Sequence, residues 1–275
     1  MTDGAALVGR VLIVAGSDSG GGAGIQADIK TVTALGGFAM TAVTALTAQN
    51  TEGVFGVHPV PPEFIAQQME VVLDDIGADA IKLGMLHNAD VVRAVVRVIG
   101  DLGGGPPVVA DPVMFAKGGH ALLEPAAMDC LRRELLPRAD VVTPNIPEAE
   151  AISELTVGTV EEMKIAAERI AGLGPKAVLL KGGHLDGDVL TDVLYADGRI
   201  ECFSDDRIDT RHTHGTGCTL ASALATGLAQ GMALRDAVVR ARAYVRTAIL
   251  SAPGFGRGHG PLNHAHTVAP FGRGG

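Results

Sequence analysis

A cysteine framed by glycines has the clearest capacity for chemistry in this sequence. The apolar segment over residues 216–230, which we expect to be a helix, opens with Thr216, Gly217 and Cys218 directly after Gly215. A helix N-terminus presents free N–H groups and a positive dipole end, and the glycines let an anion approach closely. A thiol there should ionise more easily than a free one. The pattern predicts transfer of an anionic group; the alternative is a helix cap with a buried cysteine.

A second glycine-rich loop, residues 16–24, follows an apolar run that we expect to be a strand over residues 11–15. Five of its nine residues are glycine, which is more than one turn requires. Ile25 stands where the dinucleotide-binding fingerprint needs its third glycine, and no Gly-Lys pair of a P-loop occurs in the chain. The loop is therefore either a substrate-binding loop or a tight turn between a strand and a helix.

Polar residues stand at the ends of three further predicted strands. Asp111 precedes a proline, Asn145 and Glu148 open a predicted helix, and Lys181 ends an apolar run. A few carboxylates with water suit Mg²⁺ near phosphates, and a lysine pairs with phosphate oxygens or an acid. For Asn145 and Glu148 the alternative is a simple capping arrangement.

Gln49 follows the longest predicted strand, at residues 38–47. Its planar amide matches a ring that presents adjacent donor and acceptor groups, although a turn before Gly53 explains it equally well. The histidines outside these segments show no metal-ligand spacing, and we interpret them as loop or surface residues: His87, His120, His184, His212, His214, His259, His264 and His266.

Short apolar runs alternate with amphipathic, helix-length segments along the chain, which predicts an α/β fold with a mostly parallel sheet and helices on both faces. The remaining predicted strands are 80–83, 108–110, 141–142 and 177–180, with a hairpin over 192–196 and 199–203. The remaining predicted helices are 24–35, 63–76, 89–99, 126–136, 147–153, 160–173 and 234–251. We expect a single domain over residues 1–275 with its core at about 11–266, and ligands at the carboxyl ends of the strands.

The bulk properties narrow the choice of partners. The net charge is −9 and basic runs are short, which argues against a nucleic-acid or anionic-membrane surface. The three cysteines lack a C-x-x-C spacing, so neither a disulfide framework nor a zinc site is indicated. The N-terminus has no basic segment and no apolar run reaches a membrane span, so we expect a cytoplasmic protein. We also expect a homodimer, because dimers are the commonest oligomers of soluble proteins.

Taken together, the two glycine-rich loops and the polar strand ends described above resemble the hydroxymethylpyrimidine kinase and hydroxymethylpyrimidine-phosphate kinase family of thiamine biosynthesis, in the ribokinase-like superfamily. The resemblance covers about residues 11–266, nearly the whole chain. The segments that carry it are residues 15–28, 44–51, 82–86, 111–114, 143–149, 181–184, 213–218 and 258–261. One departure is His212, where the family pattern has asparagine.

The resemblance implies a three-layer α/β/α kinase fold with a terminal hairpin, ATP as phosphoryl donor and Mg²⁺ as cofactor. It implies phosphorylation of 4-amino-5-hydroxymethyl-2-methylpyrimidine and then of its monophosphate, giving the pyrophosphate. It assigns the pyrimidine site to Gly16, Asp28, Gln49, Met85 and Val113. The alternatives are a pyridoxine or pyridoxal kinase of the same fold and a non-catalytic pyrimidine-binding protein.

For the nucleotide side, the resemblance implies that Asn145 and Glu148 organise Mg²⁺ and that Asp111 and Lys181 face the phosphates. Asp111 and Glu148 would hold the metal through water. The catalytic set would be Lys181 with the turn Gly215, Thr216, Gly217 and Cys218, where Cys218 replaces the aspartate base of many superfamily members.

Overall fold

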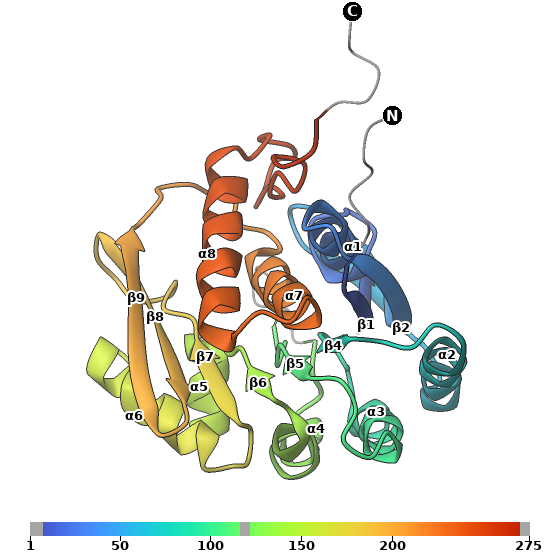
Figure 1. Cartoon of the computed structure of the whole chain (residues 1–275). Coiled ribbons are helices and arrows are strands. Elements are labelled where there is room, and N and C mark those ends of the chain that lie inside the picture. Colours follow the sequence, from blue (N-terminus) through green and yellow to red (C-terminus); the bar gives the residue numbers. More distant parts are fainter. Residues whose placement is uncertain (1–7, 116–121, 270–275) are drawn as a thin grey trace, which may run out of the picture.

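One nine-stranded sheet forms the centre of the computed structural model, which describes residues 8–115 and 122–269 (Figure 1). The strand order in the described part is β3-β2-β1-β4-β5-β6-β7-β8-β9. The bounds are β1 Arg10–Asp18, β2 Phe38–Gln49, β3 Val54–Pro59, β4 Ala80–Leu83, β5 Val108–Ala110, β6 Val141–Val142, β7 Ala177–Leu180, β8 Val189–Ala196 and β9 Arg199–Asp206. His120, interpreted above as a loop residue, lies outside the described residues, as do the extreme ends of the predicted domain.

The neighbouring strands in the order β2-β1-β4-β5-β6-β7 pair in parallel. The pairs β2–β3 at one edge and β7–β8 and β8–β9 at the other are antiparallel. The predicted mostly parallel α/β fold with a terminal hairpin is confirmed. Strand β3 was not predicted, because Gly56 and Pro59 weaken its pattern and most of its side chains are partly or fully exposed.

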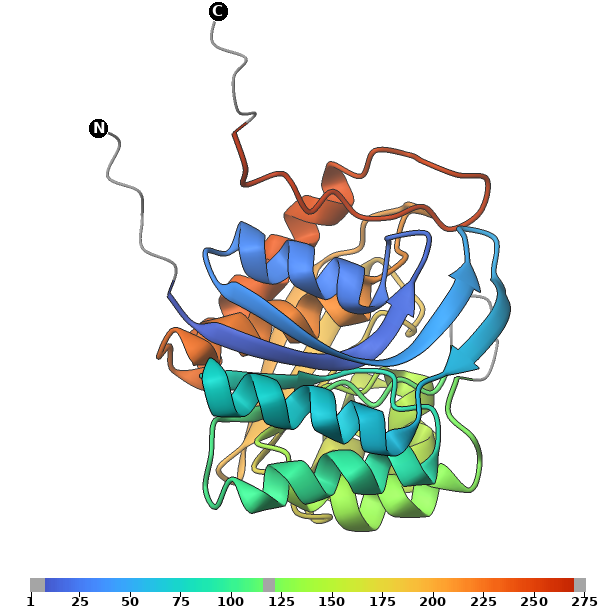
Figure 2. The same ribbon diagram turned by 90° about the vertical axis from the view of Figure 1, so that its right-hand side faces the viewer.

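Helices cover both faces of the sheet, so the fold has three layers (Figures 1 and 2). One face carries α1, α7 and α8, and the other carries α2 to α6. Their bounds are α1 Gly24–Ala34, α2 Pro62–Asp75, α3 Ala89–Asp101, α4 Ala127–Cys130, α5 Ile146–Ser153, α6 Val160–Ala171, α7 Thr216–Ala229 and α8 Leu234–Leu250. The single helix predicted over 126–136 is instead α4, a π-helical turn at Leu131–Leu135 and a 3₁₀ turn at Leu136–Arg138, which contains Pro137.

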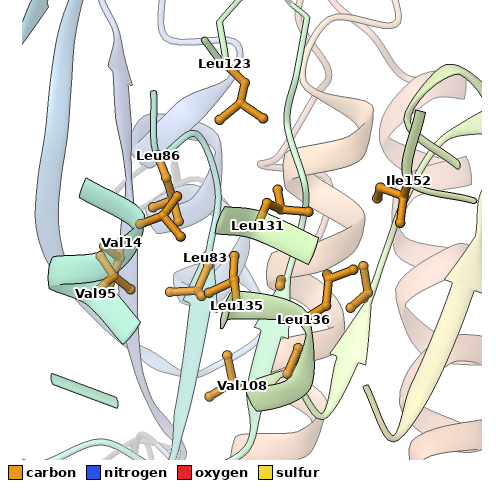
Figure 3. Close-up of a cluster of buried hydrophobic side chains, with 14 of the residues drawn as sticks. Val14, Leu83, Leu86, Val95, Val108, Leu123, Leu131, Leu135, Leu136 and Ile152 are labelled. Carbon is orange, nitrogen blue, oxygen red and sulfur yellow. The ribbon is translucent and has the colours of Figure 1, made fainter. Parts of the chain in front are cut away.

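The strands send alternate side chains into two separate hydrophobic layers. In β1, Leu12 and Val14 face the α2–α6 layer, whereas Val11 and Ile13 face α1, α7 and α8. Figure 3 shows part of the first layer, where Leu131 and Leu135 lie near the strand residue Leu83. Burial on both faces explains why the parallel strands read as continuous apolar runs. It also holds the carboxyl ends of β1, β4, β5, β6 and β7 in register at one edge of the sheet.

No helix in residues 8–115 and 122–269 has the length and apolar character needed to cross a membrane.

The segment after α8 returns over α7 and buries His264, which is therefore a loop residue as interpreted but does not lie on the surface. Its side chain is 6% exposed and its Nε2 lies 3.0 Å from Thr219 Oγ1. Burial, with smaller contributions from Lys30 and His266, lowers the pKa of His264 to about 4. The folded protein therefore holds this imidazole neutral at pH values where an unfolded chain would protonate it.

We expect His264 to make folding stability sensitive to mild acid. Its folded pKa lies below its unfolded value of about 6.5, so the stability present at pH 7.5 is lost as pH falls through that range toward 4. The loss at pH 5 should be about 2 kcal/mol. Urea unfolding at pH 7.5 and pH 5 should show this difference in the parent and a smaller one in His264→Gln. An equal pH dependence in both proteins would contradict the assignment.

Candidate active site

A cavity of about 700 Å³ lies at the carboxyl edge of the parallel strands. It is lined by every site residue predicted from the sequence except Asp28, namely Gly16, Gln49, Met85, Asp111, Val113, Asn145, Glu148, Lys181, Gly215, Thr216, Gly217 and Cys218. These residues come from the last part of β1, from the end of β2, from the segments after β4, β5, β6 and β7 (Glu148 in the first turn of α5), and from the start of α7. The topology thus brings together residues that are up to 202 positions apart, from Gly16 to Cys218.

The two glycine-rich loops press against each other at the start of α7. Gly215 has φ +82°, and a Cβ added to it would lie 1.8 Å from the carbonyl oxygen of Gly22. A Cβ on Gly217 would lie 3.1 Å from Lys181 Nζ and 3.4 Å from Asp111 Oδ2. Residue 215 therefore needs glycine, whereas a Cβ at residue 217 would crowd only the ends of the Lys181 and Asp111 side chains, and the first turn of α7 is open toward this lysine. The anion site that the sequence predicted at this turn stays a prediction, and the open turn beside Lys181 supports it.

Lys181 forms an ion pair with Asp111, at 2.8 Å between Nζ and Oδ1. The Thr143 hydroxyl donates to the same oxygen at 3.0 Å. Burial lowers the pKa of Lys181, but the Asp111 and Glu148 carboxylates outweigh it and raise that pKa above its ordinary value. The ammonium is therefore a fixed positive charge beside the α7 turn.

Asn145 and Glu148 form a capping box at the start of α5, so the capping interpretation is confirmed. The Glu148 amide donates to Asn145 Oδ1 at 2.9 Å, and the Asn145 amide donates to Glu148 Oε2 at 2.8 Å. Both residues also line the cavity. Burial of Glu148, together with the nearby Asp111 charge, raises the pKa of its carboxyl to about 7 against the opposing effect of Lys181. The positive charge of Lys181 therefore does not fully compensate the negative charges of Asp111 and Glu148.

Cys218 is partly exposed to the cavity, but its thiol does not ionise more easily than a free one. Burial raises the pKa of Cys218 to about 11, and the negative charges of Asp28 and Asp111 add to the effect. Lys82 and the backbone amide of Gly24 act in the opposite direction but do not balance it. The expectation of a lowered pKa was wrong because burial, together with two acids from other elements, outweighs the effect of the helix N-terminus.

Asp28 lies beneath the cavity and does not line it, which corrects its assignment to the substrate site. Its carboxylate is fully buried and accepts hydrogen bonds from Lys82 Nζ at 2.8 and 3.0 Å and from Ser222 Oγ at 2.7 Å. Its oxygens are therefore committed to internal partners. Lys82 was missed as a site residue, although a lysine inside the apolar strand β4 indicates a buried charge that needs a partner.

The pair Asp18–His214 was also missed. His214 Nε2 lies 2.8 Å from Asp18 Oδ2, and both residues are buried, so His214 is a loop residue as interpreted but does not lie on the surface. Asp18 also accepts hydrogen bonds from the amides of Gly20, Gly22 and Ala23, so it shapes the first glycine loop. Burial opposes ionisation of Asp18, but these bonds and His214 lower its pKa. The available signal was the position of His214 directly before Gly215.

The far end of the cavity was not predicted from the sequence. Its apolar lining comes from Leu190, Ile208, Val245 and Ile249. Beside them Arg242 Nε donates to Asp192 Oδ2 at 2.8 Å, and Asp192 accepts from the amide of Gly182 at 2.9 Å. This part of the lining comes from β8 and α8, whereas Gln49 ends β2, and it offers apolar surface for a flat aromatic group.

Comparisons with known proteins agree with this geometry. Thiamine biosynthesis bifunctional protein ThiED of Geobacter sulfurreducens is 51% identical over 256 residues, which are 93% of this chain but 52% of that protein. The chain thus spans about half the length of this relative. The hydroxymethylpyrimidine/phosphomethylpyrimidine kinase of Bacillus subtilis is 46% identical over 93% of this chain and 94% of its own.

A solved structure of an ADP complex of Bacillus subtilis pyridoxal kinase superposes with a TM-score of 0.86 at 35% identity, over 94% of this chain and 98% of that one. The sequence model described as phosphomethylpyrimidine kinase matches residues 18–263. Family model and relatives each span most of the chain, and the same segments build the cavity. The chain therefore belongs to the phosphomethylpyrimidine kinase family.

Proposed function

We propose that this protein transfers the γ-phosphoryl group of ATP to 4-amino-5-hydroxymethyl-2-methylpyrimidine and then to the resulting monophosphate. The observation that carries the proposal is a single cavity that joins an amide-bearing, ring-sized end at Gln49 to an anion-binding turn with Lys181. Phosphoryl transfer requires alignment and charge stabilisation more than covalent chemistry, and this cavity offers both.

At the acceptor end, Gln49 would hydrogen-bond the aminopyrimidine edge while Met85 and Val113 flank the ring. Gly16 leaves room for the ring, because a Cβ there would lie 3.0 Å from the Met85 sulfur. The hydroxymethyl group would then point toward the α7 turn, between Cys218 and Lys181. The apolar far end, with Val245 and Ile249, would receive the adenine of ATP.

In the first transfer, Cys218 would accept the proton of the attacking alcohol. The backbone amides of the turn from Gly215 to Cys218, together with Lys181, would stabilise charge on the transferring phosphoryl group. Because its pKa is about 11 in the free protein, the thiol is neutral at pH 7 and must become more acidic when the ligands bind. Compensation of the Asp111 charge would remove one cause of the high pKa.

In the second transfer, the attacking atom is a phosphate oxygen that is already anionic at neutral pH. It needs no base, so the same cavity could complete the second step through positioning alone. The two steps therefore depend differently on Cys218 and similarly on the α7 turn.

The acidic residues suit a hydrated magnesium ion. No cluster of three or more histidine, cysteine or acidic ligands occurs within residues 8–115 and 122–269, so a permanent metal cage is absent there. Asp111 and Glu148 provide two carboxylates on one cavity wall, and the raised pKa of Glu148 reports uncompensated negative charge. When bound there, Mg²⁺ would neutralise the polyphosphate and both acids. Asn145 would hold Glu148 in place through the capping box.

The proposal is tested by a substrate panel with the full chain, ATP and Mg²⁺. Production of the pyrimidine monophosphate and then the diphosphate, followed by phosphorus NMR, is the expected result. The pyridoxal kinase alternative, favoured by the likeness to the solved pyridoxal kinase, predicts a higher kcat/KM for pyridoxal than for the pyrimidine. Pyrimidine binding in calorimetry without ADP formation would instead identify a non-catalytic binding protein.

The homodimer remains a prediction. Its support is the β2–β3 arm at the edge of the sheet, where Leu46 and Phe55 are 50% and 72% exposed (Figure 2). Sedimentation equilibrium of the parent protein would measure the molar mass directly, and a mass of one chain would reject the dimer.

A further inference from the structure

The buried pair Asp18–His214 contacts the amide of Gln49. His214 Nε2 lies 2.8 Å from Asp18 Oδ2 and 3.4 Å from the nearer amide atom of Gln49, which is placed as Nε2. The other amide atom, placed as Oε1, lies 3.1 Å from Thr47 Oγ1. The amide thus stands between an imidazole and a hydroxyl group, and its two neighbours determine which end is oxygen.

On the imidazole side, the neighbour of Gln49 is a donor. An ionised Asp18 can only accept hydrogen bonds, and its oxygen is 2.8 Å from His214 Nε2, so Nε2 carries a proton. An amide N–H directed at the same nitrogen would place a donor against a donor. The Gln49 atom that faces His214 is therefore the carbonyl oxygen, which shares the Nε2 proton with Asp18.

On the other side, the neighbour of Gln49 is an acceptor. The Thr47 hydroxyl has one proton and two contacts, the Ser17 carbonyl oxygen at 2.9 Å and the Gln49 amide at 3.1 Å. We assign the proton to the shorter contact, the Ser17 carbonyl. Thr47 Oγ1 then has only lone pairs to offer to Gln49, so the amide atom that faces it is the NH₂ group. The His214 side requires the amide ends to be exchanged relative to their placement, and the Thr47 side accommodates the exchange when its proton goes to Ser17.

We propose that Asp18, His214 and Thr47 fix the orientation of the Gln49 amide and thereby set which edge of a pyrimidine ring the site accepts. This rests on the proposed function, in which Gln49 reads the ring. With Oε1 held toward His214 and the NH₂ group toward Thr47, one N–H and one oxygen lone pair remain for the ligand in a fixed order. That order is complementary to adjacent donor and acceptor groups in one arrangement only.

The matching pair of probes is the 4-amino-5-hydroxymethyl-2-methylpyrimidine and its 4-oxo analogue. The amino compound presents a donor at C4 and an acceptor at N3, whereas the oxo compound presents an acceptor at C4 and an N–H donor at N3. The two rings have nearly the same shape, so discrimination between them reports the amide orientation. An amide free to rotate would accept either ring.

We expect the parent protein to prefer the amino compound by about 100-fold in kcat/KM and in Kd, because the wrong order leaves buried polar groups unpaired. His214→Ala and Thr47→Val should lower this ratio below about tenfold. His214→Gln retains an N–H near the Nε2 position and Thr47→Ser retains the hydroxyl, so both should stay within about threefold of the parent ratio. The ratio of the two compounds is unaffected by a loss in kcat that is common to both. If His214→Ala does not fold, Thr47→Val still tests the inference.

Three outcomes overturn the inference: a parent that binds both pyrimidines equally, a parent that binds neither, or a ratio unchanged in both His214→Ala and Thr47→Val. Calorimetry measures binding without turnover, so it distinguishes failure of this inference from failure of the proposed function. A parent that binds the amino compound about 100-fold more tightly but transfers no phosphate would reject the kinase proposal and retain the inference.

Discussion

Replacement of Cys218 by serine is expected to slow phosphorylation of the pyrimidine alcohol by roughly 10²–10⁴-fold, the usual contribution of a general base. Serine keeps the size of the side chain and the backbone of the α7 turn, so binding of phosphate should persist. The second transfer should change by less than about tenfold, because its attacking oxygen is already anionic. Single-turnover rates measured separately with the alcohol and with the monophosphate provide the comparison.

Cys202→Ser is the matched control, because Cys202 is exposed on β9 and does not line the cavity. It should leave both rates at the parent value. Equal losses in both steps for Cys218→Ser would show that Cys218 positions the transferring group and does not remove a proton.

Replacement of Lys82 by methionine is expected to destabilise the fold by about 3–5 kcal/mol, because it leaves the Asp28 charge buried without its partner. Both side chains are fully buried, and only the Ser222 hydroxyl would remain near the carboxylate. Such a loss is a large fraction of the stability of an ordinary domain. Urea unfolding followed by circular dichroism measures the loss.

The double variant Asp28→Asn with Lys82→Met removes both charges and keeps an acceptor for Ser222, so it should recover most of the lost stability. Lys176→Met is the surface control: its partner is Asp140 and its side chain is 80% exposed, so the change should cost less than about 1 kcal/mol. A loss for Lys82→Met no larger than that of the control would show that the buried pair contributes little net stability.

The sequence was sufficient for the architecture because the signals there are local. An apolar run such as that of β4 and the amphipathic spacing of α3 specify their elements without distant partners, and the alternation of strands and helices then orders the parallel sheet. Resemblance to a family located the cavity residues, since Gly16, Gln49, Lys181 and the α7 turn all line it. Strand β3 was not predicted because it lies at the edge of the sheet, pairs only with β2, and leaves its side chains partly or fully exposed.

Properties that depend on several distant residues could not be predicted. The high pKa of Cys218 arises from burial and from acids on α1 and after β5, which no local pattern near residue 218 reveals. Likewise, Asp28 belongs to a segment that matches the substrate loop, yet on α1 its side chain is buried in the core, where it pairs with Lys82 of β4. The partner of His214 is 196 positions away in the chain.

The contact between Gly215 and the Gly22 carbonyl has an evolutionary consequence. Because any side chain at residue 215 would occupy the position of that carbonyl oxygen, the N-terminal loop and the α7 turn cannot diverge separately. A substitution on one side becomes acceptable only after the other has moved, so changes in the two loops should be epistatic.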